Sequence, residues 1–526
     1  MRKESLIPGV IMLLFLSSCK EKTVRPNILF CVSDDQSFPH AGAYGCDWVE
    51  TPAFDRVAKN GLLFTNAYTC NAKCAPSRAS ILTGRNSWQL EEAASHVGYF
   101  PTKFKTVFES LKDAGYQTGR TAKGWAPGIV RKINGKDREL IGKNYSSIKT
   151  DVPTSGIWDI DYAANFEAFL KDSQEGKPFA FWYGGIEPHR EYEYGSGIAK
   201  GGKKPSDISK VPGYWPDNDT VRTDMLDYAF EIEYFDKHLQ KMLDMLEERG
   251  LLENTLIVVT SDNGMPFPRC KGQEYPFSCH MPLAIMWADG IKKPGRKITD
   301  FVSHIDFAAT FLEIAGIDVK ESGMQPITGK SLVSIFQSKK EGRVDESRNF
   351  VLVGKERHDT GRPNDVGYPI RGIISDDFIF LKNIKTDRWP AGMPETGYLD
   401  CDGGPTKTQI LDAYNSENHK LWELSFGKRG ENEFFDLKKD PDCMENIADK
   451  EDSKTDKVFW SDLLMEKLKE QEDPRVLKNG DVFDSYLVFP SQRDFYKRYM
   501  NGEKVKTDWV NKSDFRPWQN PEFSPK

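Results

Sequence analysis

The sequence lacks a basic surplus, because 72 lysines and arginines stand against 79 acidic residues and the formal net charge is -7. Bulk attraction for nucleic acid is therefore not expected, and affinity for an anionic ligand must come from a local basic pocket. Internal repeats and low-complexity tracts are also absent. With 526 residues, 38% hydrophobic and 29% charged, the chain is typical of a soluble globular protein with more than one domain or one large domain with an appendage.

The apolar run at the N-terminus, residues 10–16, is too short to span a membrane as a mature helix. It follows Arg2 and Lys3 and leads into Leu16-Ser17-Ser18-Cys19. This order resembles a bacterial lipoprotein signal peptide, residues 1–19, with lipidation of Cys19. The resemblance implies export to the periplasm or outer membrane, with the lipid as membrane anchor. A cleaved signal peptide without lipid is the alternative.

Buried-strand patterns alternate with helical periodicity in the first part of the chain. The pattern predicts strands at 27–32, 116–121, 179–184 and 255–260, and helices at 52–60, 104–114, 162–171, 224–248 and 307–315. Such an alternation favours an α/β fold, in which a mostly parallel sheet is covered by helices.

The pattern of expected secondary structure changes after residue 370. Two short strands are expected within 371–383, another strand at 433–437, and an amphipathic helix at 458–471. We therefore predict a larger α/β domain over 20–370. A small α+β subdomain with an antiparallel sheet and a wrapping tail is expected over 371–526.

Hard oxygen ligands follow two of the predicted strands. Asp34 and Asp35 come after strand 27–32, and Asp262 and Asn263 come after strand 255–260. Ligands gather at the carboxyl ends of parallel strands, so these side chains are expected to meet. Carboxylate and amide oxygens suit Ca²⁺ or Mg²⁺ rather than a soft metal.

The run from Cys74 to Arg85 predicts a short helix that ends at Gly84. Pro76 suits an early helical position, and Ser77 or Ser80 can satisfy free amides there. Cys74 then lies at or just before a helix N-terminus that favours an anion, with Arg78 close by. This arrangement suits an enzyme that acts on sulfate or phosphate.

The same run resembles the maturation motif of the sulfatase family, cysteine-x-proline-serine-arginine followed by leucine-threonine-glycine-arginine. The resemblance implies that a maturation enzyme oxidises Cys74 to formylglycine, whose hydrate is the nucleophile. It also implies an alkaline-phosphatase-like fold and one Ca²⁺ ion. The residues that match the calcium ligands are Asp34, Asp35, Asp262 and Asn263, together with an oxygen of modified Cys74.

The resemblance also assigns a basic set around the sulfate. Arg78 and Lys123 match positions near the nucleophile, His189 matches the acid that protonates the leaving group, and Lys271 matches a cation that contacts sulfate. Fixed cations would stabilise the charge that develops in cleavage. The family usually reads lysine-x-histidine here, but this chain reads Lys123-Gly124-Trp125.

The cysteines do not imply a complete disulfide framework. Nine occur in the sequence, and an odd number remains once Cys19 and Cys74 are assigned to modifications. Cys270 and Cys279 are close enough in sequence to bridge.

Further strings resemble the N-sulfoglucosamine sulfohydrolases: 262–268, 188–190, 368–371 and 435–441. This resemblance implies N-sulfoglucosamine of heparin or heparan sulfate as the substrate. It implies substrate contacts from four residues, Glu187, Arg190, Arg357 and His358. A structural ion pair between Glu187 and Arg190, and a solvated loop position for His358, are the plainer alternatives.

Three other functions stay open at this point. One is an exo-acting carbohydrate O-sulfatase, for example on 6-O-sulfated N-acetylglucosamine. The second is a phosphodiesterase or phosphonate hydrolase on the same fold, which the complete motif around Cys74 disfavours. The third is a lipoprotein that binds sulfated glycans without cleaving them.

Overall fold

The computed structural model describes residues 25–523. The predicted signal peptide and Cys19 lie outside the described residues, so lipidation and export stay predictions. Over residues 25–523, no helix is both long enough and apolar enough to cross a membrane.

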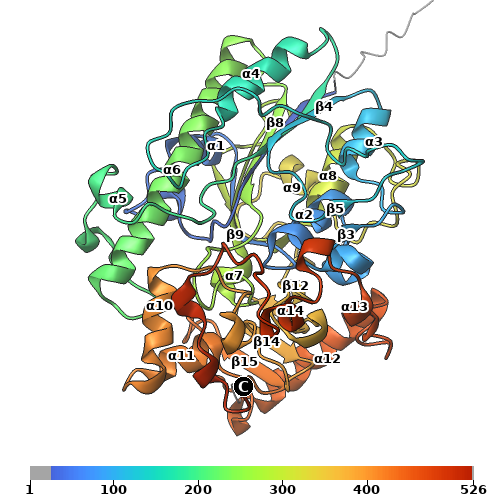
Figure 1. Cartoon of the computed structure of the whole chain (residues 1–526). Coiled ribbons are helices and arrows are strands. Elements are labelled where there is room, and N and C mark those ends of the chain that lie inside the picture. The colour runs from blue at the N-terminus through green and yellow to red at the C-terminus, as the bar shows by residue number, and fades with distance from the viewer. Residues whose placement is uncertain (1–24, 524–526) are drawn as a thin grey trace, which may run out of the picture.

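A nine-stranded sheet forms the centre of the larger part of the molecule (Figure 1). Its order is β10-β2-β9-β8-β1-β7-β4-β6, with β11 paired to β2, and only β9 runs against its neighbours. The predicted mostly parallel sheet is thus confirmed. The strands are β1 (Asn27–Ser33), β2 (Leu62–Tyr68), β4 (Gln117–Ala122), β6 (Lys143–Asn144), β7 (Phe179–Gly184), β8 (Thr255–Ser261), β9 (His280–Met286), β10 (Arg296–Ile298) and β11 (Val302–Ser303).

Helices cover both faces of this sheet, which explains why its central strands are apolar on both sides. Leu29 and Cys31 pack against α1 (Pro52–Lys59), α4 (Tyr162–Asp172) and α6 (Asp219–Glu248). Ile28 and Phe30 face the opposite layer. That layer consists of α2 (Cys74–Thr83), α3 (Val107–Asp113), α8 (Asp306–Ile314) and α9 (Val333–Gln337).

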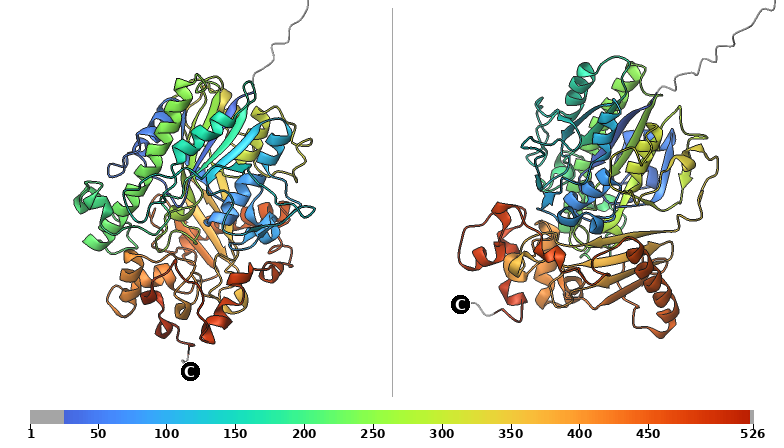
Figure 2. Two further views of the ribbon diagram at one scale, coloured as in Figure 1. Left: turned by 45° about the horizontal axis from the view of Figure 1, so that its top comes forward. Right: turned by 90° about the vertical axis from the view of Figure 1, so that its right-hand side faces the viewer.

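A second, antiparallel sheet lies below the first, in the part coloured orange to red (Figure 2). Its four strands are β12 (Phe350–Lys355), β13 (Ile370–Ser375), β14 (Phe378–Asn383) and β15 (Asn432–Asp436). The strands predicted within 371–383 and at 433–437 are confirmed. Since β12 precedes residue 371, the sheet starts before the predicted domain boundary, and the division into domains stays a prediction.

The predicted amphipathic helix near the C-terminus is α12 (Lys454–Glu470), whose Leu464 and Leu468 pack against this second sheet. The remaining strands and α-helices of the described residues, beside several short 3-10 helices, are β3 (Tyr99–Phe100), β5 (Ile129–Val130), α5 (Ser196–Ala199), α7 (Pro276–Cys279), α10 (Pro405–Asp412), α11 (His419–Phe426), α13 (Val482–Ser485) and α14 (Phe495–Met500).

Strand register brings four strand ends of the central sheet to one edge. Ser33 of β1 pairs with Ser261 of β8, and Val32 of β1 pairs with Gly184 of β7. Gly184 pairs in turn with Ala122 of β4. The residues that follow these strands therefore emerge side by side, as ligand-binding residues do in open α/β sheets.

Candidate active site

Cys74 is the first residue of α2, as the sequence predicts, and Lys73 occupies the N-cap position without a side-chain cap. The capping predicted for Ser77 and Ser80 is therefore wrong. Ser77 Oγ instead donates a hydrogen bond of 2.5 Å to the carbonyl oxygen of Asp262, so it ties α2 to the end of β8. Ser80 bonds within its own helix.

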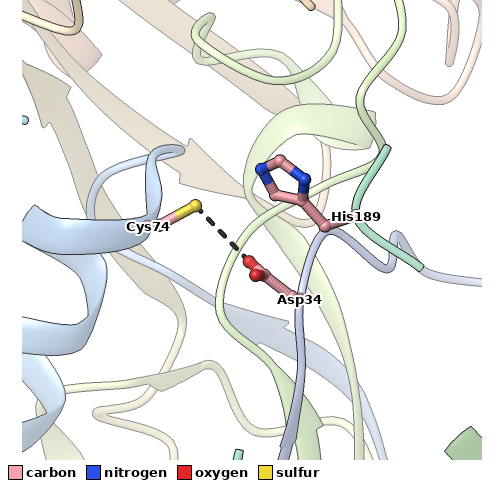
Figure 3. Close-up of side chains that lie close together, drawn as sticks. All are labelled: Asp34, Cys74 and His189. Carbon is pink, nitrogen blue, oxygen red and sulfur yellow. Dashed lines mark hydrogen bonds between the residues drawn. The ribbon is translucent and has the colours of Figure 1, made fainter. Parts of the chain in front are cut away.

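The Cys74 thiol points into a buried group of acids (Figure 3). Its Sγ lies 3.4 Å from Oδ1 of Asp34 and 3.9 Å from Oδ1 of Asp35. Burial, reinforced by the charge of Asp34, raises the pKa of the Cys74 thiol well above its usual value. A thiol that stays protonated is a poor nucleophile, so free cysteine is badly suited to attack an anion here.

The oxygen ligands predicted from the two strand ends do meet. Ligand atoms of Asp34, Asp35, Cys74 and Asp262 all lie within 4.8 Å of one another. Asn263 donates from Nδ2 to Asp35 Oδ1 at 2.7 Å, but its own Oδ1 is buried without a hydrogen-bond partner among residues 25–523. An unsatisfied amide oxygen beside three carboxylates fits one hard divalent cation.

The pKa values of the three carboxyl groups also support a bound divalent cation. Burial, with the added repulsion of Asp34, raises the pKa of Asp35 and of Asp262 to about 6, against the opposing effects of Lys271 and Arg78. Burial alone would also raise the pKa of Asp34, but nearby cations hold it well below its usual value. A divalent cation would relieve the repulsion among these carboxylates.

Three predicted cations line the same site. Arg78 Nε donates to Asp262 Oδ2 at 2.6 Å, and Lys123 Nζ pairs with Asp34. Lys271 Nζ lies 2.7 Å from Asp35 Oδ2. Nearby acids raise the pKa of all three bases despite their burial, so all three stay charged.

His189 is the most solvent-accessible of these predicted catalytic side chains, with 27% of its side chain exposed. Its Nε2 lies 3.9 Å from Asp35 Oδ2, and its Nδ1 bonds to the carbonyl oxygen of Arg190. When Nδ1 donates that bond, Nε2 is left to exchange a proton with a ligand at the mouth of the site. Burial and the charge of Lys271 lower the pKa of His189 to about 4.

Trp125 stands where the resemblance expects a second histidine. It is 8% exposed and belongs to the core beneath the sheet edge, where it packs edge-on against Phe100 with ring centroids 5.3 Å apart. An apolar contact thus takes the place of an ionisable group.

Two of the predicted substrate contacts have partners inside the protein. The Glu187 carboxylate accepts bonds from Tyr162 Oη at 2.7 Å and from the Trp158 amide at 3.0 Å. Arg190 makes a bidentate ion pair with Asp224 at 2.7 and 2.8 Å. The two therefore do not pair with each other, and a sugar-binding role for Arg190, which stays a prediction, would compete with Asp224.

The other two predicted substrate contacts lie in the segment after β12. Arg357 donates to the carbonyl oxygen of Tyr486 at 3.0 Å and so anchors a late part of the chain. His358 is fully buried, which rules out the solvated position, and its Nε2 lies 3.0 Å from Oδ1 of Asn71, just before Cys74. The structure brings His358, but not the Arg357 side chain, to the loop that precedes Cys74.

Sequence reasoning missed two buried ion pairs beside the site. Asp402 Oδ2 lies 2.7 Å from Lys271 Nζ, and Asp359 Oδ2 lies 3.0 Å from Lys73 Nζ. Lys73 was detectable as the neighbour of Cys74, but nothing in the sequence relates Asp402 to Lys271. Both acids come from loops around the second sheet.

The disulfide considered for Cys270 and Cys279 does not form. All eight cysteines between residues 25 and 523 are free thiols.

Comparison with known proteins decides the family. The model of the family described as Sulfatase matches residues 26–317, more than half of the chain. This chain belongs to the sulfatase family. It is therefore a hydrolase, and the family implies both formylglycine and a metal site, which the buried Cys74 and its surrounding acids fit.

Relatives of this sulfatase match over most of its length. Human N-sulphoglucosamine sulphohydrolase is 26% identical over 500 residues, which cover 88% of this chain and 91% of the human protein. An ulvan-active sulfatase of Formosa agariphila is 27% identical over 475 residues, covering 88% and 82%.

The fold is shared with a solved complex of a protein with its substrate D-glucosamine-2-N,6-O-disulfate. That structure has a TM-score of 0.62 and 22% sequence identity, and the match covers 85% of this chain and 98% of the other. The predicted alkaline-phosphatase-like fold of a mixed, mostly parallel sheet between helices, with a smaller antiparallel sheet, is confirmed.

Proposed function

We propose that this sulfatase hydrolyses sulfamate or sulfate ester groups of glycosaminoglycan saccharides, with N-sulfoglucosamine of heparin or heparan sulfate as the preferred unit. The observation that carries the proposal is the convergence on Cys74 of three carboxylates, a free amide oxygen and three cations, of which Arg78 and Lys271 are buried. A site of this charge receives a compact anion and a hard metal ion together.

Each group has a chemical role in this proposal. Formylglycine derived from Cys74 would supply the nucleophile as its hydrate, and calcium held by the strand-end ligands would supply positive charge beside it. Arg78, Lys123 and Lys271 hold the sulfate oxygens by charge-assisted hydrogen bonds. Nε2 of His189 delivers a proton to the leaving nitrogen or oxygen, because an unprotonated amine or alkoxide leaves poorly. The pKa of the free His189 ring is low, and the negative charge of a bound sulfate beside the ring raises it, so that Nε2 carries a proton in the complex.

The choice of substrate rests on likeness to proteins that act on glucosamine. The human relative is named for N-sulphoglucosamine, and the solved complex holds a glucosamine with both N- and O-linked sulfate. The strings around His189 and Asp262 also match the sulfohydrolase pattern. An O-sulfatase is the second candidate, since the ligand of the solved complex carries a 6-O-sulfate as well.

One substrate separates the two candidates. Purified, formylglycine-containing protein is incubated with D-glucosamine-2-N,6-O-disulfate, and the remaining monosulfate is identified by mass spectrometry and NMR. We expect loss of the N-sulfate, leaving glucosamine 6-O-sulfate. Loss of the 6-O-sulfate alone would instead establish an O-sulfatase, and release of neither group, with 4-methylumbelliferyl sulfate also intact, would contradict the proposed function.

A further inference from the structure

Lys271 is shared between two carboxylates. Its Nζ lies 2.7 Å from Asp35 Oδ2 and 2.7 Å from Asp402 Oδ2, and both Lys271 and Asp402 are almost fully buried. Asp35 belongs to the group that fits a metal ion, whereas Asp402 comes from the loop before α10. The ammonium thus bridges the metal-binding acids and a part of the chain outside the central sheet.

Asp402 also faces the mouth of the site. Ligand atoms of Asp402, Asp35 and His189 lie within 4.8 Å of one another. Only Oδ2 of Asp402 accepts a hydrogen bond from another described side chain, and that donor is Lys271. A carboxylate at this position repels a sulfate anion unless a cation neutralises it.

The loop around Asp402 is held in place from several sides. The preceding Asp400 pairs with Arg362 at 2.7 Å, and the carbonyl oxygen of Cys401 accepts a bond from Lys407 Nζ at 2.8 Å. The following Gly403 donates from its amide to the Trp509 carbonyl at 2.7 Å. Asp402 is therefore presented to Lys271 by a fixed backbone, which limits the entropy lost in orienting the lysine.

We propose that Asp402 is a positioning residue, which holds the Lys271 ammonium between the metal-binding acids and the sulfate. The inference rests on the proposed function, because it takes sulfate as the ligand of Lys271. Without Asp402, the flexible lysine chain would have Asp35 as its one remaining carboxylate partner. The Lys271 ammonium would then pair with Asp35 alone, which draws it toward a metal-binding acid and away from the sulfate.

The pair formed by Lys73 and Asp359 offers a matched control. It has the same residue types, an N–O distance of 3.0 Å and similar burial, with 2% and 6% of the side chains exposed. Asp359 belongs to none of the metal-compatible groups in the described part of the chain. Asp359 also lies 3.5 Å from Nδ1 of His96. Loss of its charge therefore tests what breaking a buried cluster of an acid and its bases does outside the metal-compatible groups.

The experiment measures binding of inorganic sulfate to the full, calcium-loaded, formylglycine-containing chain by calorimetry. A charge-assisted hydrogen bond is worth enough that Asp402→Asn should raise the sulfate Kd by about tenfold. Asp359→Asn should leave the Kd within about twofold of wild type, because Asp359 pairs with Lys73 and not with Lys271. Thermal unfolding of both variants checks that they are folded.

A double variant sharpens the result. If Asp402 acts through Lys271, Asp402→Asn combined with Lys271→Ala should bind sulfate no more weakly than Lys271→Ala alone. Multiplicative losses, or tighter binding by Asp402→Asn, would overturn the inference while the proposed function stands. A wild-type chain that neither binds sulfate nor releases it from 4-methylumbelliferyl sulfate would contradict both.

Discussion

Two buried clusters of charged residues, one around Arg371 in the second sheet and one in the candidate active site, differ in how completely their polar atoms are hydrogen-bonded. In the second sheet, Arg371 donates from Nε to Asp473 at 2.7 Å and from a terminal nitrogen to Glu356 at 2.7 Å, and its remaining nitrogen donates to backbone carbonyls. In the active site, Asn263 Oδ1 and one terminal nitrogen of Arg78 are buried without a hydrogen bond within residues 25–523.

The Arg371 cluster is paired within the protein, whereas the candidate active site keeps an unpaired amide oxygen beside three carboxylates, an arrangement that fits a metal ion. Buried polar atoms are normally satisfied, because leaving one unpaired costs free energy. The Arg371 cluster meets that demand internally, so its charges hold β13 to the helix end at Asp473. In the candidate active site, a metal ion would pair with Asn263 Oδ1, and an anion would pair with the terminal nitrogen of Arg78. Arg371 lies in a string that resembles the sulfohydrolases, yet its contacts are structural.

The largest effect is expected from Cys74→Ala, which should abolish turnover of 4-methylumbelliferyl sulfate and leave the unfolding temperature nearly unchanged. The reason is that the side chain supplies the nucleophile in the proposed reaction but contributes little packing. Cys74→Ser should also be inactive unless the host oxidises serine.

Cys70→Ala is the matched control, since this neighbouring thiol is buried against Ser80 and away from the acids. It should retain turnover. Sulfate release by Cys74→Ala at the wild-type rate would defeat the proposed mechanism.

Metal and activity should be lost together in Asp262→Ala, because the change removes one carboxylate of the metal-compatible group and the partner of Arg78. Metal analysis of the purified variant, beside turnover before and after chelation of wild type, measures the effect. Asp236→Asn is the control: this buried acid accepts bonds from the Ala53 and Phe54 amides at the start of α1. Full activity in metal-free protein would refute the site.

Arg371→Met should destabilise the fold by about 3–5 kcal/mol, because it leaves buried carboxylates without their partner. Turnover per folded molecule should stay near wild type. Chemical denaturation and active-site titration measure the two quantities. Lys382→Ala breaks an exposed pair with Glu431 on the same sheet and should cost no more than about 1 kcal/mol. A turnover loss as large as that of Asp262→Ala would show that the two clusters are not separate.

The smallest effect is expected from Ser77→Ala, at about 1–2 kcal/mol of unfolding free energy. Ser77 is buried in the active-site helix, but its hydroxyl is satisfied, since it donates to the Asp262 carbonyl and accepts from Thr69 Oγ1 at 2.9 Å. Although Ser77 lies in the candidate active site, its substitution should therefore change stability and not turnover, as expected for Arg371. Denaturant unfolding provides the measurement, and a loss above that of Arg371→Met would argue against the distinction.

The positions of site residues that lie next to a strand or helix recognisable from the sequence pattern could be predicted. Asp34 and Asp262 follow apolar strands, and ligands gather at the carboxyl ends of parallel strands, so the sequence pattern predicted that they meet. The pairing of β1 with β8 in the structure sets the two strand ends level. Cys74 was placed at a helix start because Pro76 and Gly84 delimit the helix. The serine capping failed because a tertiary acceptor, the Asp262 carbonyl, competed for the Ser77 hydroxyl.

The chain by itself therefore determined the position of the proposed nucleophile, the metal-compatible acids and the central sheet, since each depends on periodicity or on a short motif. Only the tertiary structure decided that Arg190 pairs with Asp224 and that Asp402 reaches Lys271 across 131 positions of sequence. Charge pairing depends on distance in space and on burial, and a charged residue in a loop carries no local signal of the partner that folding will bring to it.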